Sequence, residues 1–174
     1  MHQPDFLRFA LLVLTIATRL VVAAPPASTA LSSNSTAMGT VMKQQVTGPF
    51  DVTMTPQSGD ASAGGDTIGR MLLSKEYHGS LDATGKGQML ATRNLAVESG
   101  GYVALEWVVG KLDGRSGSFV LQHSGVMNRG ARALTLNVVP DSGTGELVGI
   151  AGSMEIIIAE GKHSYRFAYT LPAP

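Results

Sequence analysis

The sequence predicts an all-β domain, a small antiparallel β-barrel of about eight strands. Apolar and polar residues alternate with a period of two in one segment after another. Clusters of glycine, aspartate, serine and proline separate these segments at close to regular spacing. The chain has 21 glycines, and its 15% of charged residues lies below the roughly 25% of ordinary domains. This composition suits short strands joined by tight turns.

The first predicted strands lie in the N-terminal half of the domain. Residues 50–55 alternate strictly, which indicates a strand with one buried face. Residues 56–66 contain mostly small and polar types and predict a loop, and residues 71–78 predict the next strand. Residues 87–97 are ambiguous. They are predicted as a strand because glycines lie on both sides of them.

The second half of the domain predicts further strands, at residues 102–109, 119–125, 133–139, 147–150, 154–159 and 163–171. Two turn clusters, at residues 113–117 and 141–145, separate members of this series. The strands follow one another with short connections, which favours up-and-down pairing. A barrel of this size holds packed side chains or one small ligand, and its closure removes exposed strand edges. The predicted domain covers residues 46–172.

The N-terminus predicts an export signal over residues 1–30. Arg8 precedes an apolar run at residues 9–17, and small residues continue to Ala30. The run is shorter than the roughly 20 residues that span a bilayer, so no stable membrane insertion is expected. Residues 31–45 are rich in serine, threonine and alanine and predict a disordered linker. A secreted or periplasmic location follows.

Two other interpretations of the N-terminus stay open. The apolar run can act as an uncleaved signal-anchor instead of a cleaved signal. Translation can also begin at Met42, immediately before the domain, which would make the protein cytoplasmic.

Charge and composition exclude several classes of function. The 13 basic and 13 acidic residues give a formal net charge of zero, so no nucleic-acid partner or anionic membrane surface is expected. The chain has no cysteine, which excludes thiolate catalysis and disulfides. The histidines show no ligand spacing, so we expect no metal and no cofactor.

Two residues are candidates for acid–base chemistry. His123 shares the more apolar face of its strand with Phe119 and Leu121, which predicts an inward position. Glu106 shares a face with Tyr102, and polarity alone leaves open whether that face points inward. If Glu106 is inside, burial would raise its pKa and suit it to proton transfer. A hairpin would then bring the two candidates into one cavity.

Aromatic and neutral polar residues are the ligand-binding candidates. Tyr165 and Tyr169 lie on one face of the last predicted strand, where a stripe of aromatics forms core or lines a pocket. The remaining candidates are Tyr102, Phe119 and Gln122.

Several strings are similar to one known family. They are GRMLLSKEYHG from Gly69, GYVALEWVVGKLDGRSGSFVLQHSG from Gly101, VVPDSGTGELVGIAG from Val138 and YRFAYTL from Tyr165. They resemble a mainly bacterial domain-of-unknown-function family, number three-two-two-four. The resemblance implies a barrel related to that of allene oxide cyclase, a plant enzyme that cyclises an unstable epoxide in an apolar cavity. It implies neither that activity nor a catalytic residue, because one fold hosts many functions.

Three functional hypotheses follow. The first is a binding module that holds a small, mostly apolar ligand in the barrel. The second is a cofactor-independent isomerase or cyclase with Glu106 and His123 as its acid–base pair. The third is a structural or self-association module, a homo-oligomer formed through the strand face of Trp107.

Overall fold

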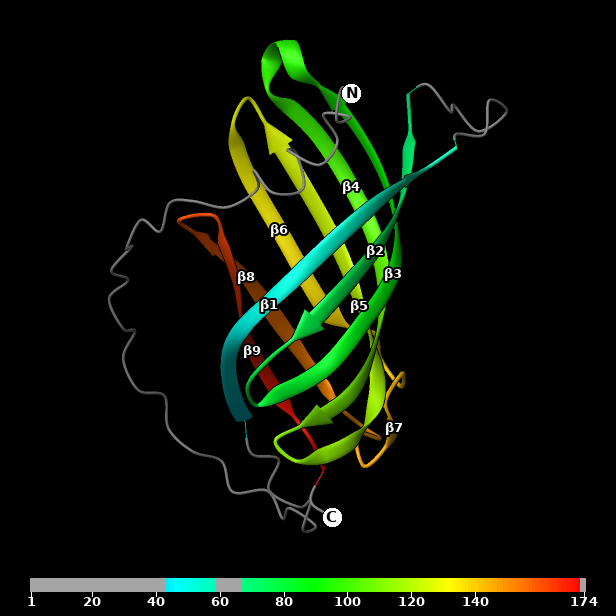
Figure 1. Ribbon diagram of the computed structural model, residues 1–174, viewed down its shortest axis with the longest axis vertical. Coiled ribbons are helices and arrows are strands. Elements are labelled where there is room, and N and C mark those ends of the chain that lie inside the picture. Colours follow the sequence, from blue (N-terminus) through cyan, green and yellow to red (C-terminus); the bar gives the residue numbers. More distant parts are fainter. Residues whose placement is uncertain (1–42, 59–66, 173–174) are drawn as a thin grey trace, which may run out of the picture.

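The computed structural model describes residues 43–58 and 67–172 (Figure 1). The predicted signal at residues 1–30 and most of the predicted linker lie outside the described residues. The first strand begins at Lys43, so Lys43 to Gln45, which we expected to end the linker, form part of the sheet. These residues pair with Thr170 to Ala168 of the last strand.

The described residues form an almost entirely β structure. Its elements are β1 (Lys43–Gln57), β2 (Gly69–Tyr77), β3 (Leu81–Asn94), the 3₁₀-helix η2 (Leu95–Val97), β4 (Ser99–Leu112), β5 (Arg115–Asn128), β6 (Ala131–Val138), β7 (Thr144–Gly145), β8 (Ala151–Ala159) and β9 (Lys162–Thr170). The long strands extend beyond the predicted ranges at one or both ends, because the tight turns occupy only a few residues.

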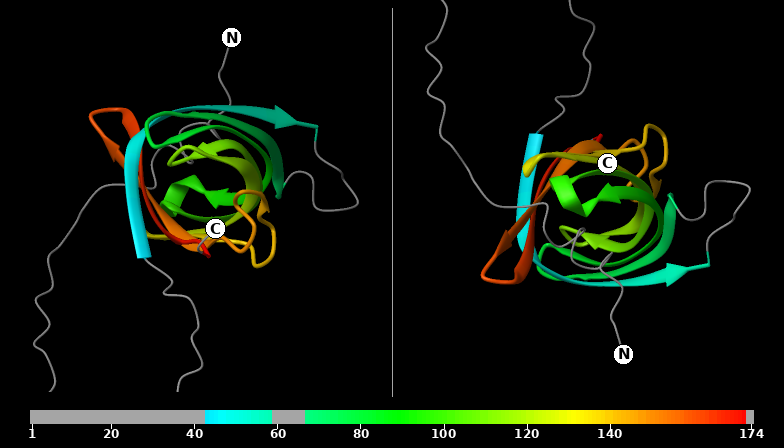
Figure 2. Two further views of the ribbon diagram at one scale, coloured as in Figure 1. Left: turned by 90° about the horizontal axis from the view of Figure 1, so that it is seen from below. Right: turned by 90° about the horizontal axis from the view of Figure 1, so that it is seen from above.

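The long strands close into a barrel, which confirms the predicted fold class. The order is β4-β3-β2-β1-β9-β8-β6-β5, every pairing is antiparallel, and β4 also pairs with β5. Figure 2 shows this ring of strands seen from both ends. The short β7 adds two residue pairs to β5 at Gly117 and Ser118. The ring therefore has eight strands, all drawn from the described residues.

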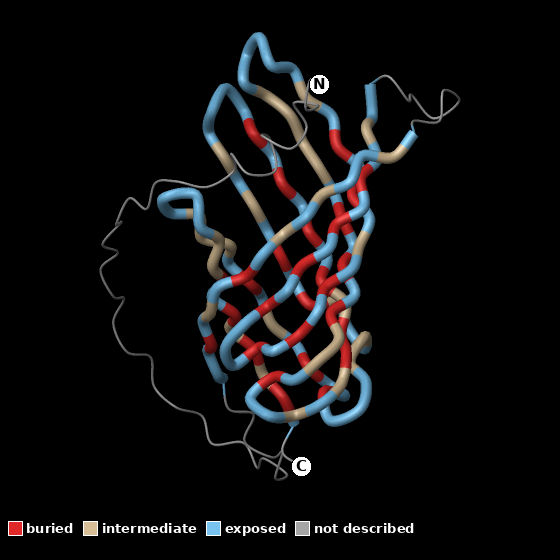
Figure 3. Tube along the Cα trace, viewed as in Figure 1, coloured by how far each residue is buried: buried red, intermediate tan, exposed pale blue. Residues whose placement is uncertain are grey.

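Buried and more exposed residues alternate along most of the strands (Figure 3), which means that every second side chain of these strands points into the barrel. The larger core cluster holds most of the buried aromatic side chains. Phe119 stacks on Phe167 at 5.5 Å between ring centroids, and Phe167 stacks on Tyr169 at 5.3 Å. A smaller cluster, which includes Met71 and Met89, covers another part of the interior. Packed side chains thus fill much of the barrel.

The predicted strand at residues 147–150 is wrong, because this segment is a turn. Leu147 donates its backbone N–H to Thr144 at 3.0 Å, and Ile150 donates to Leu147 at 3.1 Å. Gly149 adopts a φ of 78°, a left-handed conformation that interrupts a strand. Leu147 and Ile150 are nevertheless buried in the larger core cluster. Their apolar character reflects a turn folded onto the core.

The predicted boundaries around residues 87–97 are also wrong. β3 begins at Leu81, and its glycines at positions 85 and 87 lie inside the strand. A Cβ on Gly85 would lie 2.0 Å from Glu106 Oε1, so this position must be glycine to admit a neighbouring side chain. At the other end η2 replaces the strand, with the Asn94 side chain accepting from Ala96 N at 3.1 Å.

Apolar residues also gather on the outer face of the barrel, on β2, β3 and β4. The exposed members are Leu72, Leu90, Val103, Leu105 and Trp107. Trp107 points outward as the self-association hypothesis requires, with 54% of its surface exposed.

One seam of the barrel is much weaker than the others. β6 and β8 share a single residue pair, Asn137 with Ser153, whereas the β8–β9 ladder runs from Ala151 to Ala159. Figure 1 shows β6 and β8 diverging toward one end of the barrel. A groove of about 290 Å³ lies between them, and Leu134 and Ile156 are among its walls.

We expect this seam to appear in amide hydrogen exchange. Backbone N–H groups of β6 that point toward β8 lack a ladder partner along most of the strand, whereas those toward β5 are paired. Exchange in heavy water, followed by NMR, should show alternating protection along residues 131–136, with the unprotected amides at least about tenfold faster. Uniform protection along β6 would contradict a weak seam.

Candidate functional site

The site is built around a carboxylate buried inside the barrel. Glu106 on β4 is fully buried, which decides the orientation that the sequence left open. Lys75 on β2 donates to Glu106 Oε2, with 2.7 Å between Nζ and the oxygen. The hydroxyl of Tyr77 donates to Glu106 Oε1 at 2.8 Å, and Lys75 Nζ also donates to the Tyr77 hydroxyl at 3.1 Å. Each carboxylate oxygen therefore has a donor.

His123 approaches the same carboxylate from β5. Its Nε2 lies 3.0 Å from Glu106 Oε2. The two atoms are not aligned for a hydrogen bond, and the buried Nε2 has no other partner among the described residues. We treat the contact as electrostatic, because a poorly aligned N–H gains little hydrogen-bond energy. The structure thus brings the two candidate acid–base residues together, and both point into the barrel.

Two opposing effects act on Glu106. Burial raises the pKa of a carboxyl group, as the sequence analysis expected. The positive charge of Lys75 and the contact with His123 more than offset burial and lower the pKa of Glu106 to about 2. The expectation of a raised pKa was wrong, because it took no account of Lys75. Glu106 is therefore a permanent carboxylate at neutral pH.

His123 and Tyr77, unlike Lys75, are neutral at pH 7. Burial lowers the pKa of His123, and the nearby Lys75 charge acts in the same direction, while Glu106 partly opposes them. Burial also raises the pKa of the Tyr77 hydroxyl well above its usual value, as does the Glu106 charge. The buried cluster of Lys75, Tyr77, Glu106 and His123 thus carries one positive and one negative charge.

These pKa shifts predict that acid destabilises the fold in two stages. His123 is neutral when folded, with its pKa below 6.5, so protonation favours the unfolded chain once the pH falls below about 6.5. The carboxylate of Glu106 stabilises the fold fully above its unfolded pKa of 4.5, and this contribution disappears as the pH falls toward 2. Urea titrations across this range should show both stages. His123→Gln should reduce the first stage without changing the second, and His163, whose pKa burial also lowers, accounts for the remainder of the first stage. Identical profiles for the two proteins would contradict the assignment to His123.

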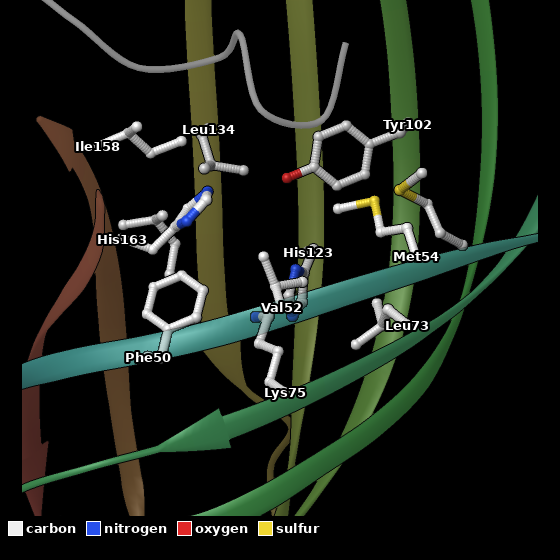
Figure 4. A pocket seen from close by; sticks show the side chains of 12 residues that line it. Phe50, Val52, Met54, Leu73, Lys75, Tyr102, His123, Leu134, Ile158 and His163 are labelled. Carbon is white, nitrogen blue, oxygen red and sulfur yellow. The ribbon is translucent and has the colours of Figure 1, made fainter. Parts of the chain in front are cut away.

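A cavity of about 60 Å³ adjoins this cluster inside the barrel (Figure 4). Its buried walls are Phe50, Leu73, Lys75, Met89 and His123. Its remaining walls are half-buried, although they belong to inward-facing positions: Val52, Met54, Tyr102, Leu134, Ile156, Ile158 and His163. Partial exposure of these inward-facing residues means that solvent reaches this part of the barrel. We call the buried walls the floor of the cavity and the half-buried walls its mouth.

The predicted ligand-binding residues lie in three places: the cavity, the packed core and the outer surface. Tyr102 lies at the mouth of the cavity. Phe119, Tyr165 and Tyr169 belong to the larger core cluster. The Tyr165 hydroxyl donates to the His78 carbonyl at 2.9 Å, and that of Tyr169 donates to Asp113 Oδ2 at 2.6 Å. Gln122 is exposed and lines a hollow on the outer surface instead of the cavity.

Sequence reasoning missed Lys75, Tyr77 and His163. Lys75 lies at every-second-residue spacing with Met71, Leu73 and Tyr77, so the period of two already placed it on their apolar face. A lysine on such a face needs a buried partner, and Glu106 was the available carboxylate. The ammonium also lies 5.3 Å from the centroid of the Phe50 ring, a cation–π contact.

Two negative findings concern the described part of the chain alone. Within residues 43–58 and 67–172, no three histidine, aspartate or glutamate side chains are grouped as a metal site requires. In the same residues no helix has the length and apolar character needed to cross a membrane.

Fold and site together define a class: a small closed β-barrel with an internal ion pair beside a cavity. The chain belongs to the family described as "Protein of unknown function (DUF3224)", whose model matches residues 46–169. This confirms the resemblance seen in the sequence.

One solved structure is closely similar to this chain. The crystal structure of a protein with unknown function from the same family, from Shewanella oneidensis MR-1, is 48% identical, with a TM-score of 0.70. The match covers 76% of this chain and 99% of that one. No curated protein matches the sequence. The relation to allene oxide cyclase stays a prediction.

Proposed function

We propose that the protein binds a small, mostly apolar molecule in the cavity inside its barrel. One observation carries this proposal: the interior is not completely filled, and most of the cavity walls are apolar side chains. Pockets for small molecules combine such walls with a few convergent polar groups. Lys75, Tyr102, His123 and His163 are the polar groups here.

The volume of the cavity limits the ligand. About 60 Å³ is far below the roughly 300–1,000 Å³ of pockets for drug-sized molecules. The cavity therefore suits a compound of a few non-hydrogen atoms, or one end of a longer molecule that leaves through the mouth. Leu134 and Ile156 also line the groove between β6 and β8, so the weak seam offers a second route to the cavity.

A cavity-filling substitution tests this function. Leu134→Phe adds volume at the mouth and is expected to weaken binding at least about tenfold, with a change in the free energy of unfolding below about 1.5 kcal/mol. Ligand-observed NMR with short-chain hydrocarbons, alcohols, ketones and acids measures the affinities. Val126→Phe, on the exposed face of β5, is the matched control. If no compound binds the unmodified protein, or if both variants bind equally well, the cavity is not the binding site.

The proximity of Glu106 and His123 supports a second candidate, a cofactor-independent isomerase or cyclase. With Glu106 held as a carboxylate, His123 would move the proton and Glu106 would orient the imidazole. The test follows exchange of the α-hydrogens of 2-hexanone for deuterium by NMR. Exchange that requires His123 would support catalysis. A rate equal to that of buffer alone would leave binding as the function.

We also propose that the protein is exported through its N-terminal segment, with a cytoplasmic location as the alternative if translation starts at Met42. Native mass spectrometry of the full chain, expressed in an export-competent host, tests this. Removal of about the first 30 residues would support export. A chain that keeps Met1 would support the anchored or the cytoplasmic form. An added mass of a few hundred daltons would mark a retained ligand.

A further inference from the structure

The polar groups at the floor of the cavity restrict the chemistry of its ligand beyond size. This inference rests on the proposed binding function. Figure 4 shows Lys75 and His123 side by side among apolar side chains. Both side chains are almost fully buried, at 7% and 5% exposure. A ligand that reaches the floor must satisfy these groups or leave them without partners.

The ammonium group of Lys75 has one N–H to spare. A lysine ammonium carries three N–H donors. Among the described residues its hydrogen-bond partners are two oxygens, Glu106 Oε2 at 2.7 Å and the Tyr77 hydroxyl at 3.1 Å. Nζ also lies 5.3 and 5.4 Å from the ring centroids of Phe50 and Tyr77, whose faces attract the positive charge but do not replace a hydrogen-bond acceptor. The floor of the cavity therefore favours a ligand with a hydrogen-bond acceptor.

Charge balance excludes an anionic acceptor. Lys75 is already paired with the carboxylate of Glu106, and His123 is neutral at pH 7. A ligand carboxylate that reached Lys75 would lie close to Glu106, so the site would hold two negative charges and one positive charge. An unpaired buried charge is strongly unfavourable. An acceptor without charge meets the requirement of Lys75 and leaves the ion pair balanced.

We infer that the ligand is a neutral carbonyl compound, a ketone, aldehyde or ester, whose oxygen accepts a hydrogen bond from the spare N–H of Lys75. Its apolar remainder contacts Met54, Leu134 and Ile156 at the mouth. A pure hydrocarbon fits the walls equally well but leaves the ammonium N–H unsatisfied. The carbonyl compound should therefore bind at least about tenfold more tightly than a hydrocarbon of the same shape.

Three matched probes test this inference: 2-hexanone, its hydrocarbon isostere 2-methyl-1-hexene, and hexanoate. Dissociation constants are measured by NMR titration of the full-length protein at neutral pH. The expected order is 2-hexanone tightest, with the hydrocarbon at least about tenfold weaker and hexanoate weakest. Hexanoate as the tightest ligand, or equal binding of 2-hexanone and its isostere, would overturn the carbonyl assignment and leave the binding function intact. If none of the three binds, the binding function fails with it.

Two variants connect the preference to Lys75. Lys75→Met combined with Glu106→Gln removes both charges together, which avoids an unpaired buried charge. This variant should lose the tenfold preference for 2-hexanone and keep its affinity for 2-methyl-1-hexene. Ser124→Ala, at an exposed position beside His123 on β5, should keep the preference. A preference that survives in the double variant would overturn the role of Lys75. A circular dichroism spectrum first establishes that the double variant is folded.

Discussion

Replacing Lys75 with methionine is expected to lower the free energy of unfolding by about 3–5 kcal/mol. Methionine keeps the length and apolar stem of lysine, so the packing changes little and the charge disappears. Glu106 is then left fully buried with the Tyr77 hydroxyl on one oxygen and no cation beside the other. Part of the cost will be relieved as the pKa of Glu106 rises, because the ammonium that holds it low is gone.

Urea titration at neutral pH measures this effect, and two comparisons show its origin. The double variant Lys75→Met/Glu106→Gln should regain most of the stability, because removal of both charges restores balance. Lys86→Met, on the exposed face of β3, should change stability by less than about 0.5 kcal/mol. A single Lys75→Met variant within about 1 kcal/mol of the unmodified protein would show that the ion pair is not a structural requirement.

The barrel was predictable because its main signal is local. Alternation of apolar and polar residues identifies a strand and its buried face without knowledge of its partners. His123 was placed inside in this way, and the structure agrees. The pairing of adjacent strands was predicted from the short turns, because two strands joined by a tight turn pair with each other in antiparallel orientation.

The errors arose where tertiary contacts decide local structure. Gly85 and Gly87 marked the start of a predicted strand, but they lie inside β3, where neighbouring groups leave no room for a Cβ. Leu147 and Ile150 indicated a strand by their apolar character, but they belong to a turn that covers the core. The pKa of Glu106 depended on a lysine 31 positions away in the sequence. No local pattern reports such a pairing.

Replacing Gly85 with alanine is expected to destabilise the protein by about 3 kcal/mol, at the upper end of the usual cost of overpacking. The added Cβ would lie 2.0 Å from Glu106 Oε1 and 2.9 Å from its Cδ. A free glutamate side chain would turn away from the methyl group. This carboxylate is held by Lys75 and Tyr77, so it can move only by losing those hydrogen bonds.

The control is Gly101→Ala on β4, where the nearest atom to an added Cβ is the Gly125 carbonyl oxygen at 3.6 Å. Urea denaturation should show little change for Gly101→Ala and a large loss for Gly85→Ala. Gly85→Ala should also be non-additive with Lys75→Met, since both act through the position of Glu106. Once the methyl group has displaced the carboxylate, the hydrogen bond between Lys75 and Glu106 is already weakened, so removal of the ammonium costs less stability. Strict additivity of the two substitutions would show that Gly85→Ala acts on the backbone alone. It would also show that the missing Cβ of Gly85 is not what makes room for the buried carboxylate.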